Sequence, residues 1–147
     1  KALLIDKNDL DKTIKELYPN EKQIASNVEF CCVGNFDSNS CDDVHELENI
    51  DLAVVKGNFA VAENGAIWMK NKDNRQRALY FIAQNIIIVI DEKDILNNMH
   101  EAYEKINFEE KGYGVFISGP SKTADIEQSL VIGAHGPKSG YVIFTKS

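Results

Sequence analysis

The chain has few of the features that mark disulfide-rich or metal-binding proteins. It contains three cysteines in 147 residues. The adjacent Cys31 and Cys32, with Cys41, match neither a secreted disulfide framework nor the spacing of a zinc site. The short cysteine spacings that hold iron–sulfur clusters are also missing. We therefore expect no metal and no cofactor on this chain, and we expect any electron transfer to belong to a partner.

Long hydrophobic runs are also missing. The longest apolar run, Ile86 to Ile90, is far shorter than the roughly 20 residues that span a bilayer, and no hydrophobic signal region opens the chain. These features predict a cytoplasmic protein without a membrane span. Because the sequence begins with Lys1 instead of Met, we expect that a piece before it has been removed or left out.

Positive charge is in deficit. Sixteen basic residues against 23 acidic ones give a net charge of -7, which repels phosphate backbones and argues against a nucleic-acid partner. Net charge does not exclude an electropositive pocket at one place on the surface. The length and the ordinary hydrophobic content of 44% predict one globular domain over residues 1–147.

Motifs for nucleotides and catalytic metals are missing as well. No GxGxxG sequence follows a strand, and no HExxH sequence is present. The segments 119–123 and 136–139 look like the end of a phosphate-binding loop. However, Pro120 and Pro137 interrupt the backbone N–H groups that such a loop needs.

The first half of the chain predicts a helix, strands and a hairpin. Apolar residues at helical spacing predict an amphipathic helix over Asn8–Tyr18, and β-branched residues predict one or more strands within Ile24–Val33. A short helix is expected over Cys41–Ile50. Asn58–Glu63 and Ala66–Met69 predict a hairpin, because an Asn-Gly pair joins them.

The second half predicts alternating strands and helices. Strands are expected at Asn85–Ile90, Tyr113–Ile117 and Tyr141–Thr145, and helices at Asp94–Ile106 and Thr123–Ile132. This order is typical of α/β proteins with a largely parallel, layered sheet.

The junction after Ile117 is a candidate anion site. A tight turn opens into a predicted helix there, and free backbone N–H groups at such a point attract carboxylate or phosphate. The candidate ligand groups are Ser118, Gly119, Ser121 and Thr123. In the alternative interpretation, Ser121 or Thr123 caps the helix, with Asp125 and Glu127 in its first turn.

Two further side chains are candidates for chemistry. Glu63 stands at the end of a predicted strand, where ligands of such sheets gather, and can act as base or nucleophile. A solvated glutamate beside an Asn-Gly turn is the alternative. His135 lies among small residues after the predicted helix, where it can also simply cap carbonyl groups.

Four sequence blocks together resemble the lactate-utilisation (LUD) domain family, protein C type. They are Gly57–Gly65, Gln84–Val89, Phe116–Glu127 and Gly133–Pro137. The resemblance covers the chain from Asp51 to its end. It implies a three-layer, Rossmann-like α/β fold similar to the sugar-phosphate isomerase and coenzyme A transferase superfamily.

The resemblance also implies a function. Family members work with two iron–sulfur partners that oxidise L-lactate to pyruvate, and the protein C type lacks cluster cysteines. We therefore expect a non-redox subunit or accessory protein that binds a small carboxylate or phosphate, or a partner. The alternative is a transferase or ligase, similar to coenzyme A transferases or formyltetrahydrofolate cyclo-ligases, that uses Glu63.

The resemblance also strengthens Glu63 and the 118–123 turn as candidates for a shared pocket. With their neighbours, the ligand-binding candidates are Asn64, Gly65, Ser118, Gly119, Pro120, Ser121, Thr123, Asp125 and His135.

Overall fold

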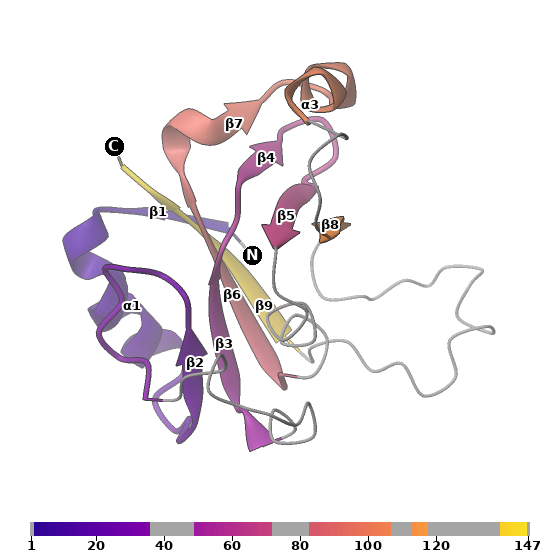
Figure 1. Cartoon of the computed structure of the whole chain (residues 1–147). Coiled ribbons are helices and arrows are strands. Elements are labelled where there is room, and N and C mark those ends of the chain that lie inside the picture. The colour runs from indigo at the N-terminus through magenta and orange to yellow at the C-terminus, as the bar shows by residue number, and fades with distance from the viewer. Residues whose placement is uncertain (1, 36–48, 72–82, 107–112, 118–138, 147) are drawn as a thin grey trace.

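The computed structural model describes residues 2–35, 49–71, 83–106, 113–117 and 139–146. Within them, two β-sheets pack face to face, with one helix against each sheet (Figure 1).

The larger sheet has five strands, and every neighbouring pair is parallel. The strands in spatial order are β1 (Ala2–Ile5), β9 (Ser139–Thr145), β6 (Asn85–Asp91), β3 (Leu52–Lys56) and β2 (Ile24–Ser26). Because the strands are parallel, all five carboxyl ends lie at one edge of the sheet. This edge forms the surface on which ligands of open α/β sheets bind.

The continuous apolar run of β6 follows from the burial of both faces of the sheet. Ile87 and Val89 point toward helix α1 (Leu10–Leu17), which follows a short 3-10 turn, η1 (Lys7–Asp9). Ile86, Ile88 and Ile90 alternate with them and point toward the second sheet. A strand covered on both faces needs no polar positions.

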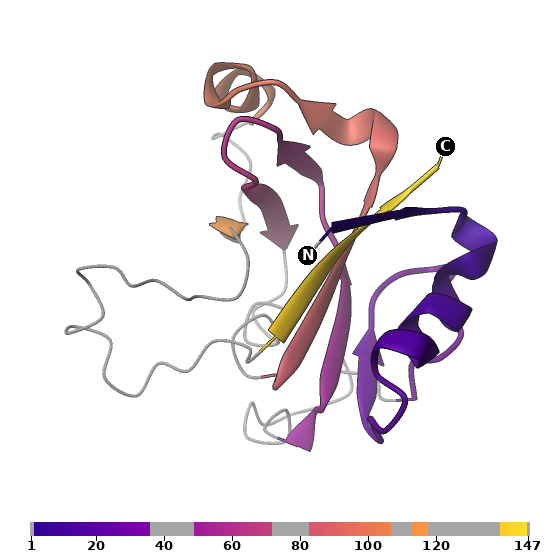
Figure 2. The same cartoon turned by 180° about the vertical axis from the view of Figure 1, so that it is seen from behind.

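The second sheet has four strands in the order β7 (Ile95–Leu96), β4 (Phe59–Val61), β5 (Ile67–Asn71) and β8 (Tyr113–Ile117). Its inner face packs into the core through Ala60, Ile67 and Met69. Its outer face carries Phe59 and Val61, against which helix α3 (Met99–Lys105) places Ala102. The turned view of Figure 2 shows α1 and the second sheet on opposite sides of the parallel sheet.

The predicted α/β fold around a parallel sheet is confirmed. The hairpin is confirmed as well, because β4 and β5 pair antiparallel with Phe59 opposite Trp68. So are the first helix, which covers the centre of its predicted range, and the strands β6 and β9.

Three expectations need correction. The strand at Ile24 ends at Ser26, and a turn follows in which Cys31 N donates to Val28 O. The helix expected from Asp94 begins only at Met99, because Ile95–Leu96 pairs with β4 as a strand. Strand β8 joins the second sheet antiparallel to β5, not the parallel sheet.

Two predicted helices, Thr123–Ile132 and most of Cys41–Ile50, lie outside the described residues. The expected order of a strand leading into a helix after Ile117 therefore stays a prediction.

Candidate functional site

Glu63 lies in the hairpin loop and caps a helix. Its side chain is exposed, and its Oε2 accepts a hydrogen bond of 3.0 Å from Met99 N, the first residue of α3. The Glu63 N–H donates to Asn97 O at 3.1 Å. Asn98 caps the same helix through its side chain, which accepts from Glu101 N at 2.9 Å. The carboxylate therefore accepts from one of the first N–H groups of the helix, which have no partner within the helix itself.

The Asn-Gly pair shapes this loop. The Asn64 side chain accepts from Ala66 N at 3.0 Å, and Gly65 takes a φ of 71°, a left-handed conformation that glycine adopts without steric cost. These roles are conformational. The remaining ligand-binding candidates lie outside the described residues: Ser118, Gly119, Pro120, Ser121, Thr123, Asp125 and His135.

A small cavity lies at the carboxyl ends of the parallel strands. It has a volume of about 180 Å³ and is lined by Lys7, Phe30, Lys56, Val89, Asp91, Lys93, Asp94 and Thr145. Among the described lining residues, three lysines against two aspartates leave a net positive charge, although the chain as a whole carries -7. The cavity is therefore a local electropositive spot at the edge where ligands of such sheets bind.

Asp91 ends β6 and organises two of these lysines. Its Oδ2 lies 3.6 Å from Lys7 Nζ and 3.9 Å from Lys93 Nζ, and its Oδ1 accepts from Lys93 N at 3.1 Å. The backbone N–H of Lys93, together with the two ammonium groups, lowers the pKa of Asp91. Asp91 is therefore ionised at neutral pH, and it holds both lysines beside the cavity.

Lys56 ends β3 and faces the same cavity. Its backbone N–H donates to Asn27 Oδ1 at 2.8 Å, which fixes the end of the strand. Within the described part of the chain, its ammonium group forms no ion pair. Thr145, opposite Asp91 in the sheet, adds a buried hydroxyl to the wall. Lys56 thus supplies the positive charge that is available to an anion.

Sequence reasoning missed this lysine set. Lys56 is the last residue of one strand, and Lys7 and Lys93 each follow the end of another strand by two positions. In a parallel sheet such positions meet at one edge. A lysine at or just after the end of several apolar runs was therefore the signal in the sequence. Using it would have required β1 and β3 to be predicted as strands.

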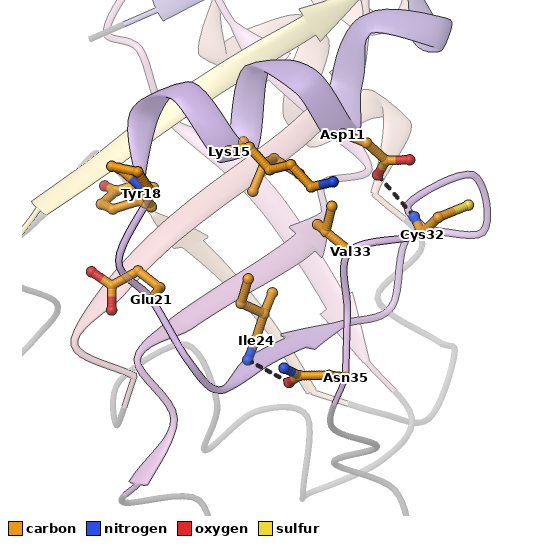
Figure 3. A pocket seen from close by; sticks show the side chains of 10 residues that line it. Asp11, Lys15, Tyr18, Glu21, Ile24, Cys32, Val33 and Asn35 are labelled. Carbon is orange, nitrogen blue, oxygen red and sulfur yellow. Dashed lines mark hydrogen bonds between the residues drawn. The ribbon is translucent and has the colours of Figure 1, made fainter.

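A larger cavity of about 610 Å³ lies beside α1, at the side of strand β2 (Figure 3). Asp11 on α1 accepts from Cys32 N at 2.8 Å across it, and Ile24 N donates to Asn35 Oδ1 at 2.9 Å. Its walls mix apolar side chains with charges of both signs, so they favour no single ligand class.

Tyr18 and Glu21, which line this cavity, are the two ends of a chain of hydrogen bonds. The Tyr18 hydroxyl and Ser139 Oγ are 2.7 Å apart, and Ser139 Oγ donates to Asn85 Oδ1 at 2.7 Å. Asn85 Nδ2 in turn donates to Glu21 Oε1 at 3.3 Å. Burial raises the pKa of Tyr18. This network ties α1 to the amino ends of β6 and β9, and we interpret it as structural.

Comparison with known proteins decides the family. The model of the LUD domain matches residues 42–145. The chain belongs to the LUD-domain family. This LUD domain is 34% identical over 109 residues to lactate utilization protein C of Bacillus pumilus (strain SAFR-032), covering 70% of the chain and 45% of that protein. It is 30% identical to lactate utilization protein C of Geobacillus kaustophilus (strain HTA426), covering 69% and 45%.

The LUD domain thus spans less than half the length of these relatives. Its fold is similar to the crystal structure of a DUF162 family protein from Deinococcus radiodurans, with a TM-score of 0.76, 99% coverage of this chain and 87% of that one. At a sequence identity of 19%, this similarity is evidence for the fold and not for the function. Within the described residues, no helix is long and apolar enough to cross a membrane.

Proposed function

We propose that this LUD domain is a non-redox subunit or accessory protein of an iron–sulfur system that oxidises L-lactate, and that it acts in the cytoplasm. In this role it binds a small carboxylate at the carboxyl ends of its parallel strands. The family and the relatives named lactate utilization protein C support the pathway. The observation that carries the binding role is the electropositive cavity around Lys56.

The cavity suits a small carboxylate in charge and in size. Ammonium groups form charge-assisted hydrogen bonds with carboxylates. A volume of about 180 Å³ is below the roughly 300–1,000 Å³ of cavities that hold drug-sized molecules. A space of this size suits an acid of three or four carbons better than a whole nucleotide or coenzyme A.

Ligand binding is tested by thermal unfolding in the presence of L-lactate, pyruvate, phosphate or a coenzyme A thioester. A ligand that binds the native state raises its stability according to the ratio of ligand concentration to dissociation constant. We expect a saturable rise in Tm with lactate or pyruvate and none with the thioester. If none of the four raises Tm, the binding role is wrong.

The partner role is tested separately by gel filtration. The purified chain is mixed with purified iron–sulfur proteins of a lactate-utilisation system from the same genome. Co-elution of the chain with the visible absorbance of the clusters supports the proposal. Elution of the chain alone at micromolar concentrations would count against it.

The alternative is a transferase or ligase in which Glu63 acts as base or nucleophile. Its carboxylate is exposed, as such a role requires, but it is engaged with the Met99 N–H. Glu63→Gln keeps an oxygen that can accept this hydrogen bond and removes the base. Loss of turnover of any substrate in that variant, with an unchanged Tm, would support the alternative.

A further inference from the structure

The small cavity at the carboxyl ends of the parallel strands, here called the strand-end cavity, is lined by charges that affect which anions it accepts. This inference rests on the proposed binding role and goes one step beyond it. The lining carries Lys7, Lys56 and Lys93 against Asp91 and Asp94. Among the described lining residues, the positive excess is therefore a single unit charge, and its distribution decides which charges an anion meets.

Asp91 offsets one of the two lysine charges on one side of the cavity. Both of its lysine contacts are made by the same oxygen, Oδ2, at 3.6 and 3.9 Å. The Lys7 ammonium also lies 5.7 Å from the centre of the Phe30 ring, a cation–π contact that holds it further in place. The three groups together keep one unit of positive charge, half of what the two lysines would present without Asp91.

Asp94 is also engaged, since its Oδ1 lies 4.0 Å from Lys105 Nζ. Among the described lining residues, Lys56 is the remaining ammonium group without an ion pair. The lining thus combines one ammonium group without an ion pair, that of Lys56, with the Asp91 carboxylate at the end of the neighbouring strand.

We propose that Asp91 is a specificity-determining residue that makes this cavity selective for monoanions over dianions. A monocarboxylate places its single charge against Lys56 and keeps its uncharged end toward Asp91. A dianion of similar size has to bring its second charge close to the Asp91 carboxylate. Repulsion between like charges at short range rejects such a ligand.

The test is a calorimetric titration at constant ionic strength and neutral pH with L-lactate and malonate, which both have three carbons but carry one and two charges. The unmodified chain is expected to prefer lactate. Asp91→Asn keeps an oxygen to accept from Lys93 N, removes the negative charge and frees the two lysines. We expect malonate affinity relative to lactate to rise roughly tenfold.

The matched control is Glu92→Gln, which changes the net charge equally at the neighbouring position but outside the cavity lining. Its malonate-to-lactate ratio should stay that of the unmodified chain. As a second variant, Lys93→Met leaves Asp91 less neutralised, so it should shift the ratio in the opposite direction. Circular dichroism checks that each variant is folded.

Each outcome separates the two proposals. Lactate binding with an unchanged ratio in Asp91→Asn would overturn the specificity inference and leave the binding role standing. A preference for malonate in the unmodified chain would overturn the inference as well. Absence of binding for both anions would instead contradict the proposed function.

Discussion

At the scale of single residues, Trp68 packs in an aromatic cluster of this LUD domain. Trp68, the one tryptophan of the chain, packs against Phe116 with ring centres 4.8 Å apart and against Phe59 at 6.4 Å. Its ring also covers Gly114, where an added Cβ would collide with the Cη2 and Cζ2 atoms of the indole. The missing side chain at Gly114 thus makes room for the tryptophan.

We therefore expect Gly114→Ala to destabilise the fold by about 1–3 kcal/mol, because the indole has to shift within a packed aromatic cluster. Urea unfolding measures the loss. Tryptophan fluorescence reports on the same site, so its native emission should change as well. Equal stability together with an unchanged emission spectrum would contradict this account of the packing.

The Tyr18 phenol makes stability depend on alkaline pH. Burial raises its pKa above the ordinary value near 10. A group whose folded-state pKa is raised contributes its stability fully below the unfolded pKa and loses it as pH rises through the folded pKa. Stability should therefore fall above about pH 10.

Urea midpoints measured on either side of pH 10 check this pH dependence in three proteins: the unmodified chain, Tyr18→Phe and, as control, Tyr103→Phe. Tyr103 is 55% exposed. The fall should be shallower in Tyr18→Phe than in the other two. Three parallel pH profiles would mean that Tyr18 does not contribute to it.

At the scale of elements, the hairpin and α3 stabilise each other. The hairpin loop supplies Glu63 to the first turn of α3, and Asn98 supplies the side-chain cap. Both acceptors satisfy N–H groups that a helix cannot pair internally. The turn of the hairpin and the start of the helix are thus held together by Glu63, which the sequence offered as a catalytic candidate.

Loss of the cap at Asn98 should cost about 1 kcal/mol in Asn98→Ala, whereas Asn98→Ser, which keeps an oxygen, should recover most of it. Glu63→Gln should change stability by less than about 0.5 kcal/mol, because its amide oxygen still accepts from Met99 N. Thermal unfolding of the three variants checks these values. A large loss in Asn98→Ser would show that the cap is not the cause.

Elements with a local sequence signal could be predicted, whereas strands that form only by pairing with a distant segment could not. Strand β6 and the hairpin were predictable, because an apolar run and an Asn-Gly pair are local signals. The segment from Asp94 to Met99 was not, since Ile95 and Leu96 become a strand only through pairing with β4. The sequence analysis also predicted neither β3, which has just five residues, nor β1.

The same limit applies to the candidate site. Glu63 was selected for its position near a strand end, and the strand it follows, β4, belongs to the second sheet and not to the parallel sheet whose carboxyl ends line the small cavity. Lys7, Lys56 and Lys93 are separated by up to 86 positions in the sequence and meet only through the parallel pairing of β1, β9, β6 and β3. No local pattern reports such a meeting. The predicted 118–123 turn lies outside the described residues and stays a prediction.

On the scale of the whole molecule, an acidic chain concentrates positive charge at one edge of its parallel sheet. The net charge of -7 keeps most anions away from the surface, while the strand-end cavity collects three lysines. This contrast is what the proposed binding of a small carboxylate depends on. The chain spans less than half the length of its named relatives. The proposed partner role therefore rests on the family and on those relatives, and not on this fold.

The most direct test of the central claim is the affinity for L-lactate of the unmodified chain, Lys56→Met and the exposed control Lys12→Met, measured by calorimetry. Loss of a charge-assisted hydrogen bond costs about 1.5–3 kcal/mol, so binding should weaken roughly 10- to 150-fold in Lys56→Met and stay unchanged in Lys12→Met. Equal affinity in all three proteins would show that the strand-end cavity is not the carboxylate site.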